Sequence, residues 1–296
     1  MTTQIRKLTD KDLPILIKLL NKAYANAYEF KPYSEDWLHS MLKENKLQIL
    51  IAEENGKIIG SAAYHDGHWG KEIEWLTVHE NSDRKLIENR LVTETEKLVK
   101  RDTVFTAVDA GSPKIEEWTQ QGYKQEGGLY HMVARLHSPM SLPKVPEGIV
   151  LRSLKPEEEK EFVETVNAGF GAERVKMGDI QIWKTESPPF DEEWIHLAEA
   201  KGKIVSIVVG KPDTIYNKVF NANRGYLGPA TTLPEYRDKN LAAMLTIRAM
   251  NLLFEKGMKT VALYTSETNV PSITLLRKIG FEVGHNWKFM RKSLKN

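Results

Sequence analysis

A run of basic and small residues in the C-terminal half, Arg237-Asp238-Lys239-Asn240-Leu241-Ala242, has the composition of a turn that binds phosphate. It lies between a predicted strand at 226–233 and a predicted helix at 241–254. At such a junction several backbone N–H groups point outward, and the helix dipole adds partial positive charge. The run contains no proline, so every residue keeps its N–H group. The pattern favours an anionic ligand such as a pyrophosphate.

Asn240 stands where a phosphate-binding turn is expected to have glycine. Glycine accepts left-handed backbone angles, and it lets a phosphate approach closely. Asparagine is the side chain next most tolerant of left-handed angles, so that property is expected to survive. Its amide can also donate a hydrogen bond, but its bulk hinders close approach. We therefore predict weakened rather than lost binding.

The string GPATTLPEYRDKNLAAML (228–245), followed by NVPSITLLRKIGF (269–281), resembles the GCN5-related N-acetyltransferase (GNAT) family. The residues that match the family pattern are Arg237, Ala242, Asn269, Gly280 and Phe281. The resemblance implies acetyl-coenzyme A as cosubstrate: loop amides hold its pyrophosphate, and a strand splayed from its neighbour pairs with the pantetheine arm. The cosubstrate-binding residues implied are Ala230, Thr231, Thr232, Arg237, Asp238, Lys239, Asn240, Leu241, Ala242, Ala243, Asn269 and Ser272.

The implied reaction is attack by an amine on a thioester. A backbone N–H near Thr231 and Thr232 would polarise the thioester carbonyl, so no particular side chain is required for that step. The family commonly protonates the leaving thiolate with a tyrosine seven residues after the Asn, but Leu276 occupies that position. Tyr264 and Tyr226, on adjacent predicted strands, are the substitutes to test, although both also fit as ordinary sheet tyrosines. Ser272 fits equally as a cosubstrate contact or as an early helix residue that bonds its own backbone.

The segment 168–194 lies between the first helix and the first strand of this half and is the predicted acceptor site. Its aromatic residues fit as walls of a pocket, and its carboxylates as groups that hold or deprotonate a cationic amine. The alternative for each residue is core packing or solvated surface. The candidates are Phe170, Trp183, Phe190 and Trp194 among the aromatics, and Glu173, Asp179 and Asp191 among the carboxylates.

The elements that must position these residues follow from the periodicity of apolar side chains. The predicted helices are 156–168, 241–254 and 271–279; the predicted strands are 195–199, 203–209, 226–233, 261–264 and 281–292. The order of helices and strands predicts an α/β fold with a mixed sheet flanked by helices.

The chain contains an internal repeat with an offset of 146 residues. LIAEENGKIIG (50–60) aligns with HLAEAKGKIVS (196–206), and QQGYKQEGGLYHMVARL (120–136) matches KIGFEVGHNWKFMRKSL (278–294). Three prolines in SPMSLPKVPEG (138–148) indicate a semi-rigid linker. We therefore predict two tandem GNAT acyltransferase folds: an N-terminal domain over 1–137, the linker over 138–148, and a C-terminal domain over 149–296.

The first repeat has lost the phosphate-binding pattern. Its matching stretch, VHENSDRKLIENRL (78–91), has no glycine and places Asp83 and Glu88 where phosphates would lie. Carboxylates repel an anionic ligand, so we predict a degenerate first domain. A pair with one silent half resembles the mycothiol synthase type of tandem acetyltransferase.

Composition excludes several other classes of protein. The absence of cysteine excludes disulfides and thiolate sites, and a net charge of +2 gives no bias toward nucleic acid. His65 and His68 lack a third ligand at recognisable spacing, so no metal site is expected. The polar N-terminus and the absence of long apolar runs favour a cytoplasmic protein without a membrane partner.

The expected partner is therefore a small-molecule or peptide amine. The alternatives are a non-catalytic sensor of acyl-coenzyme A or of an amine, and an assembly protein that uses the paired folds as an interface.

Overall fold

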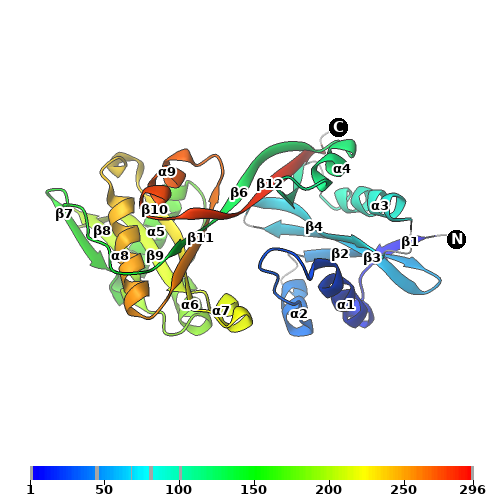
Figure 1. Ribbon diagram of the computed structural model, residues 1–296, viewed down its shortest axis with the longest axis horizontal. Helices are drawn as coiled ribbons and strands as arrows, with labels where there is room; N and C mark the ends of the chain where they lie inside the picture. Colours follow the sequence, from blue (N-terminus) through cyan, green and yellow to red (C-terminus); the bar gives the residue numbers. More distant parts are fainter. Residues whose placement is uncertain (1–2, 44–46, 68, 80–82, 100–101, 295–296) are drawn as a thin grey trace. The chain divides into compact units, whose positions relative to one another are not determined.

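The computed structural model describes residues 3–43, 47–67, 69–79, 83–99 and 102–294 (Figure 1). The chain divides into two compact units. The first comprises 1–129 with 286–296, and the second comprises 130–285. Both are mixed α/β units.

The first unit contains a sheet in the order β1-β2-β3-β4-β5-β12. Its helices are α1 (Leu13–Tyr24), α2 (Glu35–Lys43), α3 (Arg84–Glu96) and α4 (Lys114–Gln120). Its strands are β1 (Gln4–Lys7), β2 (Leu47–Glu54), β3 (Lys57–Gly67), β4 (Gly70–Val78) and β5 (Thr103–Asp109), with the end of β12 (Glu282–Ser293).

The second unit contains a sheet in the order β6-β11-β10-β9-β8-β7. Its helices are α5 (Glu159–Phe170), α6 (Asp179–Glu186), α7 (Thr214–Phe220), α8 (Leu241–Glu255) and α9 (Val270–Lys278). Its strands are β7 (Ile149–Ser153), β8 (Ile195–Ala200), β9 (Lys203–Pro212), β10 (Arg224–Thr232) and β11 (Thr260–Ser266), with the end of β6 (Lys124–Arg135).

The final strand of each repeat extends into the sheet of the other unit. Residues 287–293 of β12 pair antiparallel with β5, from Trp287 opposite Asp109 to Ser293 opposite Thr103. Residues 130–135 of β6 belong to the second unit, where the N–H of Leu136 donates to the carbonyl of Lys259 at 2.8 Å. The bounds of the compact units therefore differ from the domain bounds predicted from the sequence at these two strands.

The segment 138–148 forms no helix or strand. Asn251 exchanges two hydrogen bonds with the Met140 backbone at 2.8 and 2.9 Å.

An ion-pair network repeated at the offset of 146 supports the duplication. Arg6 binds Asp12 at 2.7 Å and Glu53 at 2.6 Å. Arg152 binds Glu158 at 2.7 Å and Glu199 at 2.8 Å in the same way. In each unit the guanidinium joins the first strand, the start of the first helix and the second strand of the sheet.

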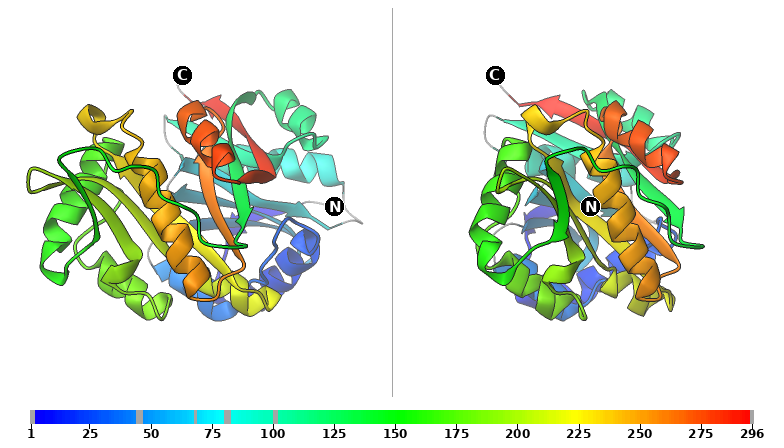
Figure 2. Two further views of the ribbon diagram at one scale, coloured as in Figure 1. Left: turned by 60° about the vertical axis from the view of Figure 1, so that its left-hand side comes forward. Right: turned by 90° about the vertical axis from the view of Figure 1, so that its left-hand side faces the viewer.

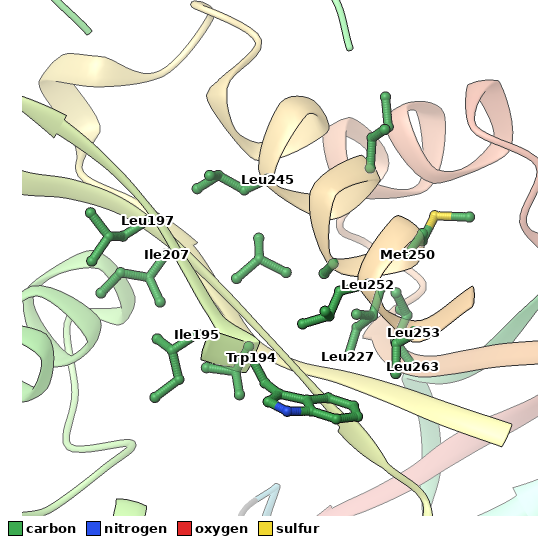
Figure 3. Packing of buried hydrophobic residues seen from close by; sticks show 14 of the residues in the cluster. Trp194, Ile195, Leu197, Ile207, Leu227, Leu245, Met250, Leu252, Leu253 and Leu263 are labelled. Atoms are coloured by element: carbon green, nitrogen blue, oxygen red, sulfur yellow. The ribbon is translucent and has the colours of Figure 1, made fainter. Parts of the chain in front are cut away.

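The core of the second unit explains why its elements match the predicted ones. Helix α8 places Leu253 beside Leu227 of β10 and Leu263 of β11, in a hydrophobic cluster that also contains Leu245 and Met250 (Figure 3). Burial of one apolar side chain of this size contributes about 1.5–3 kcal/mol. Figure 2 (right) shows α8, in orange, and α5, in green, on opposite sides of strands β8–β10. Residues that alternate along β9 and β10 therefore face either α8 or the pair α5 and α6.

Candidate functional site

Strands β10 and β11 separate at the position that the resemblance implies. Parallel pairing joins Arg224 to Thr260, Gly225 to Val261 and Tyr226 to Ala262. Between the described residues of these strands, no pair follows Tyr226, although β10 continues to Thr232. The pairing of β10 with β9 also shifts register between Leu227 and Ala230, where the Gly228–Pro229 peptide bond is cis. Among the described strands, none pairs with this edge of β10 after Tyr226.

The direction of the β10 amides follows from the ladder with β9. The N–H of Leu233 donates to the carbonyl of Val205 at 2.9 Å, so the backbone polar groups of Leu233 point toward β9. Because the direction of these groups alternates from residue to residue along a strand, those of Thr231 also point toward β9. The backbone N–H and C=O groups of Ala230 and Thr232 point the other way, toward the diverged β11. The hydroxyl of Ser206 donates to the Thr231 carbonyl at 3.0 Å and fixes this orientation. The N–H groups of Ala230 and Thr232 are thus directed at the open edge.

The turn before α8 has the backbone conformation predicted for it. Asn240 is left-handed, with φ 57° and ψ 15°, which confirms that asparagine supplies the angles expected of a glycine. Asp238 is also left-handed, with φ 62°. Among the described residues, none accepts a hydrogen bond from the N–H groups of 238–243, whereas Met244 donates to the Asn240 carbonyl at 3.1 Å. Six successive amides are available to an anion at the start of a 15-residue helix.

Two cations flank this turn. The Arg237 guanidinium donates to the carbonyls of Thr232 at 3.3 Å and Gly169 at 3.4 Å, and its side chain is exposed. The Lys239 ammonium lies 4.7 Å from the centroid of the Tyr236 ring. Arg237 precedes the run 238–243 and Lys239 belongs to it, so their charges add to the attraction of the turn for a diphosphate.

Gly169 is a residue of this region that sequence reasoning missed. A Cβ atom at Gly169 would lie 2.0 Å from Oγ1 of Thr231, so only glycine lets α5 approach β10 this closely. The Arg237 contact with the Gly169 carbonyl joins the same two elements. The only sequence signal was the short spacing of Gly169 and Gly171 at the end of a predicted helix.

The start of α9 is held by its own cap. The Asn269 side chain accepts a hydrogen bond from the Ser272 N–H at 3.3 Å, and both residues lie at the surface end of the helix. This bond gives Asn269 a structural role, whether or not a cosubstrate contacts it. Leu276, on the same helix, is 3% exposed and belongs to the hydrophobic core. The residue at the usual tyrosine position is therefore a packing residue.

Tyr226 and Tyr264 lie side by side at the point where the strands separate. Their ring centroids are 6.1 Å apart, and Tyr264 also stacks on His131 of β6 at 4.7 Å. Burial raises the pKa of Tyr226 to about 12, although a hydrogen bond with the Tyr264 backbone opposes the shift. Tyr264 is 41% exposed. The raised pKa keeps the Tyr226 phenol protonated near neutral pH, so it can act as a proton donor.

The structure divides the predicted acceptor residues into two groups. Phe190 and Trp194 are 3% and 1% exposed and belong to the core, so they are not walls of an open site. Phe170 is 39% exposed, and Trp183 is half-buried with edge-on contacts to Phe162 and Phe190.

The three acceptor carboxylates all have local partners. Asp179 accepts the Lys176 N–H at 2.9 Å, and Asp191 accepts the Glu193 N–H at 2.8 Å. Glu173 forms an exposed ion pair with Lys176 at 3.2 Å. None of these interactions supports the expectation that these groups hold a cationic amine.

Two cations occupy this part of the second unit instead, and sequence reasoning missed both. Lys211 of β9 lies directly opposite Tyr226 of β10, and its ammonium is 5.0 Å from the Trp183 ring centroid. The Arg174 guanidinium is 4.6 Å from the centroid of Phe170. Burial lowers the pKa of both Lys211 and Arg174.

The corresponding turn of the first unit differs in its charges. Residues 80–82 lie outside the described residues, but Asp83 caps α3 by accepting the Leu86 N–H at 3.4 Å. Glu88 is 9% exposed and pairs with Arg84 at 2.8 Å, so its charge is locally balanced. A cavity of about 230 Å³ lies beside these groups, and Lys22 and Lys114 also line it. The predicted repulsion of anions is therefore weaker at Glu88 than its sequence position suggests.

Strand β4, the first-unit counterpart of β10, carries a cluster of titratable groups. His65 of β3 lies opposite Glu72, and its Nδ1 is 3.7 Å from the Glu74 carboxylate. Burial raises the pKa of Glu72 to about 8 and of Glu74 to about 7.

His68 lies outside the described residues. Within the described part of the chain, no three His, Asp or Glu side chains gather as metal ligands. No helix there is long and apolar enough to cross a bilayer.

Comparison with known families identifies both repeats. Residues 150–284 match the profile of the acetyltransferase (GNAT) domain, and residues 13–123 match that of the acetyltransferase (GNAT) family. Mycothiol acetyltransferase of Thermobispora bispora is 27% identical over 170 residues, which cover 54% of this chain and 55% of that protein. The enzyme of the same name from Nocardia farcinica is 27% identical over 178 residues, or 55% of each chain. The chain thus spans about half the length of the curated relatives it matches.

Solved structures agree with the fold over the whole length. A GCN5-related N-acetyltransferase from Sphaerobacter thermophilus superposes with a TM-score of 0.72 at 20% identity, covering 99% of this chain and 96% of that one. A tandem GNAT protein from the clavulanic acid biosynthesis pathway gives a TM-score of 0.68 at 16% identity, with 99% and 98% covered. The two family matches in succession show that the chain belongs to the GNAT acetyltransferase family and carries two GNAT domains, and the solved structures agree in fold.

Proposed function

We propose that this protein transfers an acetyl group from acetyl-coenzyme A to an amine, and that the second unit performs the reaction. The observation that carries the proposal is the junction of β10 and α8. There, six consecutive amides without acceptors in the described structure meet a left-handed Asn240 and a strand edge that β11 has left open. A diphosphate fits the amides, and an extended amide-containing arm fits the edge of β10.

Two backbone amides and a tyrosine have roles in the proposed acetyl transfer. The N–H groups of Ala230 and Thr232 face the open edge, where one of them polarises the thioester carbonyl. The neutral amine attacks the carbonyl carbon, the carbon–sulfur bond breaks, the nitrogen releases one proton to water, and the thiolate takes up a proton from a donor that water then reprotonates. Tyr264 supplies that proton in this proposal, because it is the more exposed of the two phenols and lies on β11 beyond the last pair with β10.

Leu276 stands where the family commonly has a tyrosine that protonates the thiolate, and its presence slows this reaction without preventing it. General acid catalysis is typically worth about 10²–10⁴-fold, and a thiol with a pKa near about 8.5 is a fair leaving group without assistance. Tyr226 is the second candidate donor.

Release of free coenzyme A tests the proposal. A thiol-reactive dye reports the product when the full chain is mixed with acetyl-coenzyme A and a panel of primary amines. We expect amine-dependent release above the rate of hydrolysis. Binding of coenzyme A without release by any amine would favour the sensor, and failure to bind at millimolar concentration would favour the assembly protein.

A further inference from the structure

One face of the second sheet carries a half-buried ammonium beside the proposed reaction site. Lys211 and Tyr226 are direct cross-strand neighbours, so their side chains project from the same face. That face also carries α6, whose Trp183 ring lies 5.0 Å from the Lys211 ammonium. The Arg174 guanidinium lies over Phe170, at the end of α5. The face of the second sheet from which Tyr226 projects is therefore cationic and aromatic.

The carboxylates around Lys211 have other partners or are solvated. Asp213 binds the Arg224 guanidinium at 2.7 Å, and Asp179 accepts the Lys176 N–H at 2.9 Å. Glu186 is exposed. Each is near enough to stabilise the ammonium slightly, yet in the described part of the chain none forms an ion pair with Lys211 within 4 Å. A cation–π contact with Trp183 stabilises the ammonium by less than the removal of an ion from water costs.

The first repeat shows that the fold does not need a lysine at this position. At the offset of 146 residues, Lys211 corresponds to His65, whose cross-strand partner is Glu72. Glu74 lies two residues further along the same strand and the same face. The equivalent surface of the first unit is therefore acidic. A half-buried ammonium at 211 is better explained by a ligand than by the architecture.

We propose that the acceptor of the second unit is a small amine that also carries a carboxylate, of the amino-acid type, and that Lys211 binds this carboxylate. The inference rests on the proposed function and specifies its substrate. The carboxylate would complete the missing ion pair, and the planar rings of Trp183 and Phe170 would contact the apolar part of the molecule. Arg174 adds a second positive charge to the same surface, which disfavours acceptors with an additional cationic group.

The test compares amino acids with their amides, which differ only in the carboxylate. Glycine, alanine, leucine, phenylalanine and aspartate are each paired with the α-amide. Binding to the full chain with coenzyme A is measured by ligand-observed NMR, and kcat/KM is measured by release of coenzyme A. The variants are Lys211→Met, Lys211→Arg and, as a matched control, Lys218→Met on the exposed surface of α7.

We expect at least one acid to bind at least tenfold more tightly than its amide. Lys211→Met should reduce that acid-to-amide ratio at least tenfold, Lys211→Arg should retain most of it, and Lys218→Met should leave it unchanged. A ratio that Lys211→Met does not alter, or a preference for every amide, would overturn the inference. Binding with this preference but without acetyl transfer would refute the proposed function and leave the carboxylate site standing.

Discussion

Replacing Asn240 by glycine separates the two properties of the turn before α8. At φ 57° and ψ 15°, asparagine occupies a region that costs most L-residues roughly 1–2 kcal/mol, and asparagine less. Glycine removes this strain but gives the unfolded chain about 0.5–1 kcal/mol of additional entropy. The two effects nearly cancel, so we expect the melting temperature to change by less than about 2 °C.

The effect on the ligand is expected to be larger. The Asn240 side chain makes no capping hydrogen bond and stands at the centre of the free amides. Its removal lets a diphosphate approach the backbone, and we estimate a gain of about 1 kcal/mol, or roughly fivefold in Kd. Isothermal titration calorimetry with coenzyme A measures this gain.

Two further variants complete the design. Asn240→Ala keeps a Cβ atom in the left-handed region, so it should lower the melting temperature by about 2–4 °C. Asn221, with φ 49°, ends α7 away from the turn, and Asn221→Gly relieves comparable strain without affecting the ligand. If Asn240→Gly leaves the Kd of coenzyme A unchanged or weakens binding, the Asn240 side chain does not hinder the approach of a phosphate to the backbone of the turn.

Three other changes are informative. Tyr264→Phe should lower kcat at least tenfold with an unchanged Kd for coenzyme A, whereas unaltered kinetics would exclude it as the proton donor. Gly169→Ala places a Cβ atom against the Thr231 hydroxyl and should weaken coenzyme A binding about fivefold or more. Adding Thr231→Ala should restore binding. If it does not, a clash with Thr231 is not the cause of the loss. The raised pKa of Glu72 makes the folded protein retain a proton that the unfolded chain releases, so the free energy of unfolding should fall as pH rises from about 4.5 to about 8. Glu72→Gln should reduce this loss between pH 5 and 8 by about 1–2 kcal/mol. Identical melting curves for the two proteins at each pH would show that the pKa of this carboxyl is not raised.

Local patterns predicted the elements of the second unit closely. The helix expected over 241–254 is α8 at Leu241–Glu255, and the strand expected over 203–209 is the start of β9. The helix has apolar residues at helical spacing, the strand is a nearly continuous apolar run, and turn residues bound both. The left-handed turn at Asn240 was also predictable, since few side chains adopt that conformation.

Features set by tertiary structure were not predictable. Helices α6 and α7 are short, and α7 is largely exposed, so neither gives a clear periodic signal. The exchange of β6 and β12 between the units depends on which sheet edge each strand finds, and the alternation of side chains is identical in either sheet.

The acceptor region shows the same limit. Phe190 packs into the core while Trp183 contacts Lys211, although in the sequence the two aromatic residues fitted equally well as pocket walls or as core residues.

A crystal structure of the full chain with acetyl-coenzyme A tests the central claim most directly. The account predicts ligand density in the second unit, with the diphosphate oxygens within hydrogen-bond distance of the N–H groups of 238–243 and the pantetheine arm along the open edge of β10. Density confined to the first unit, or no bound ligand at saturating concentration, would contradict it.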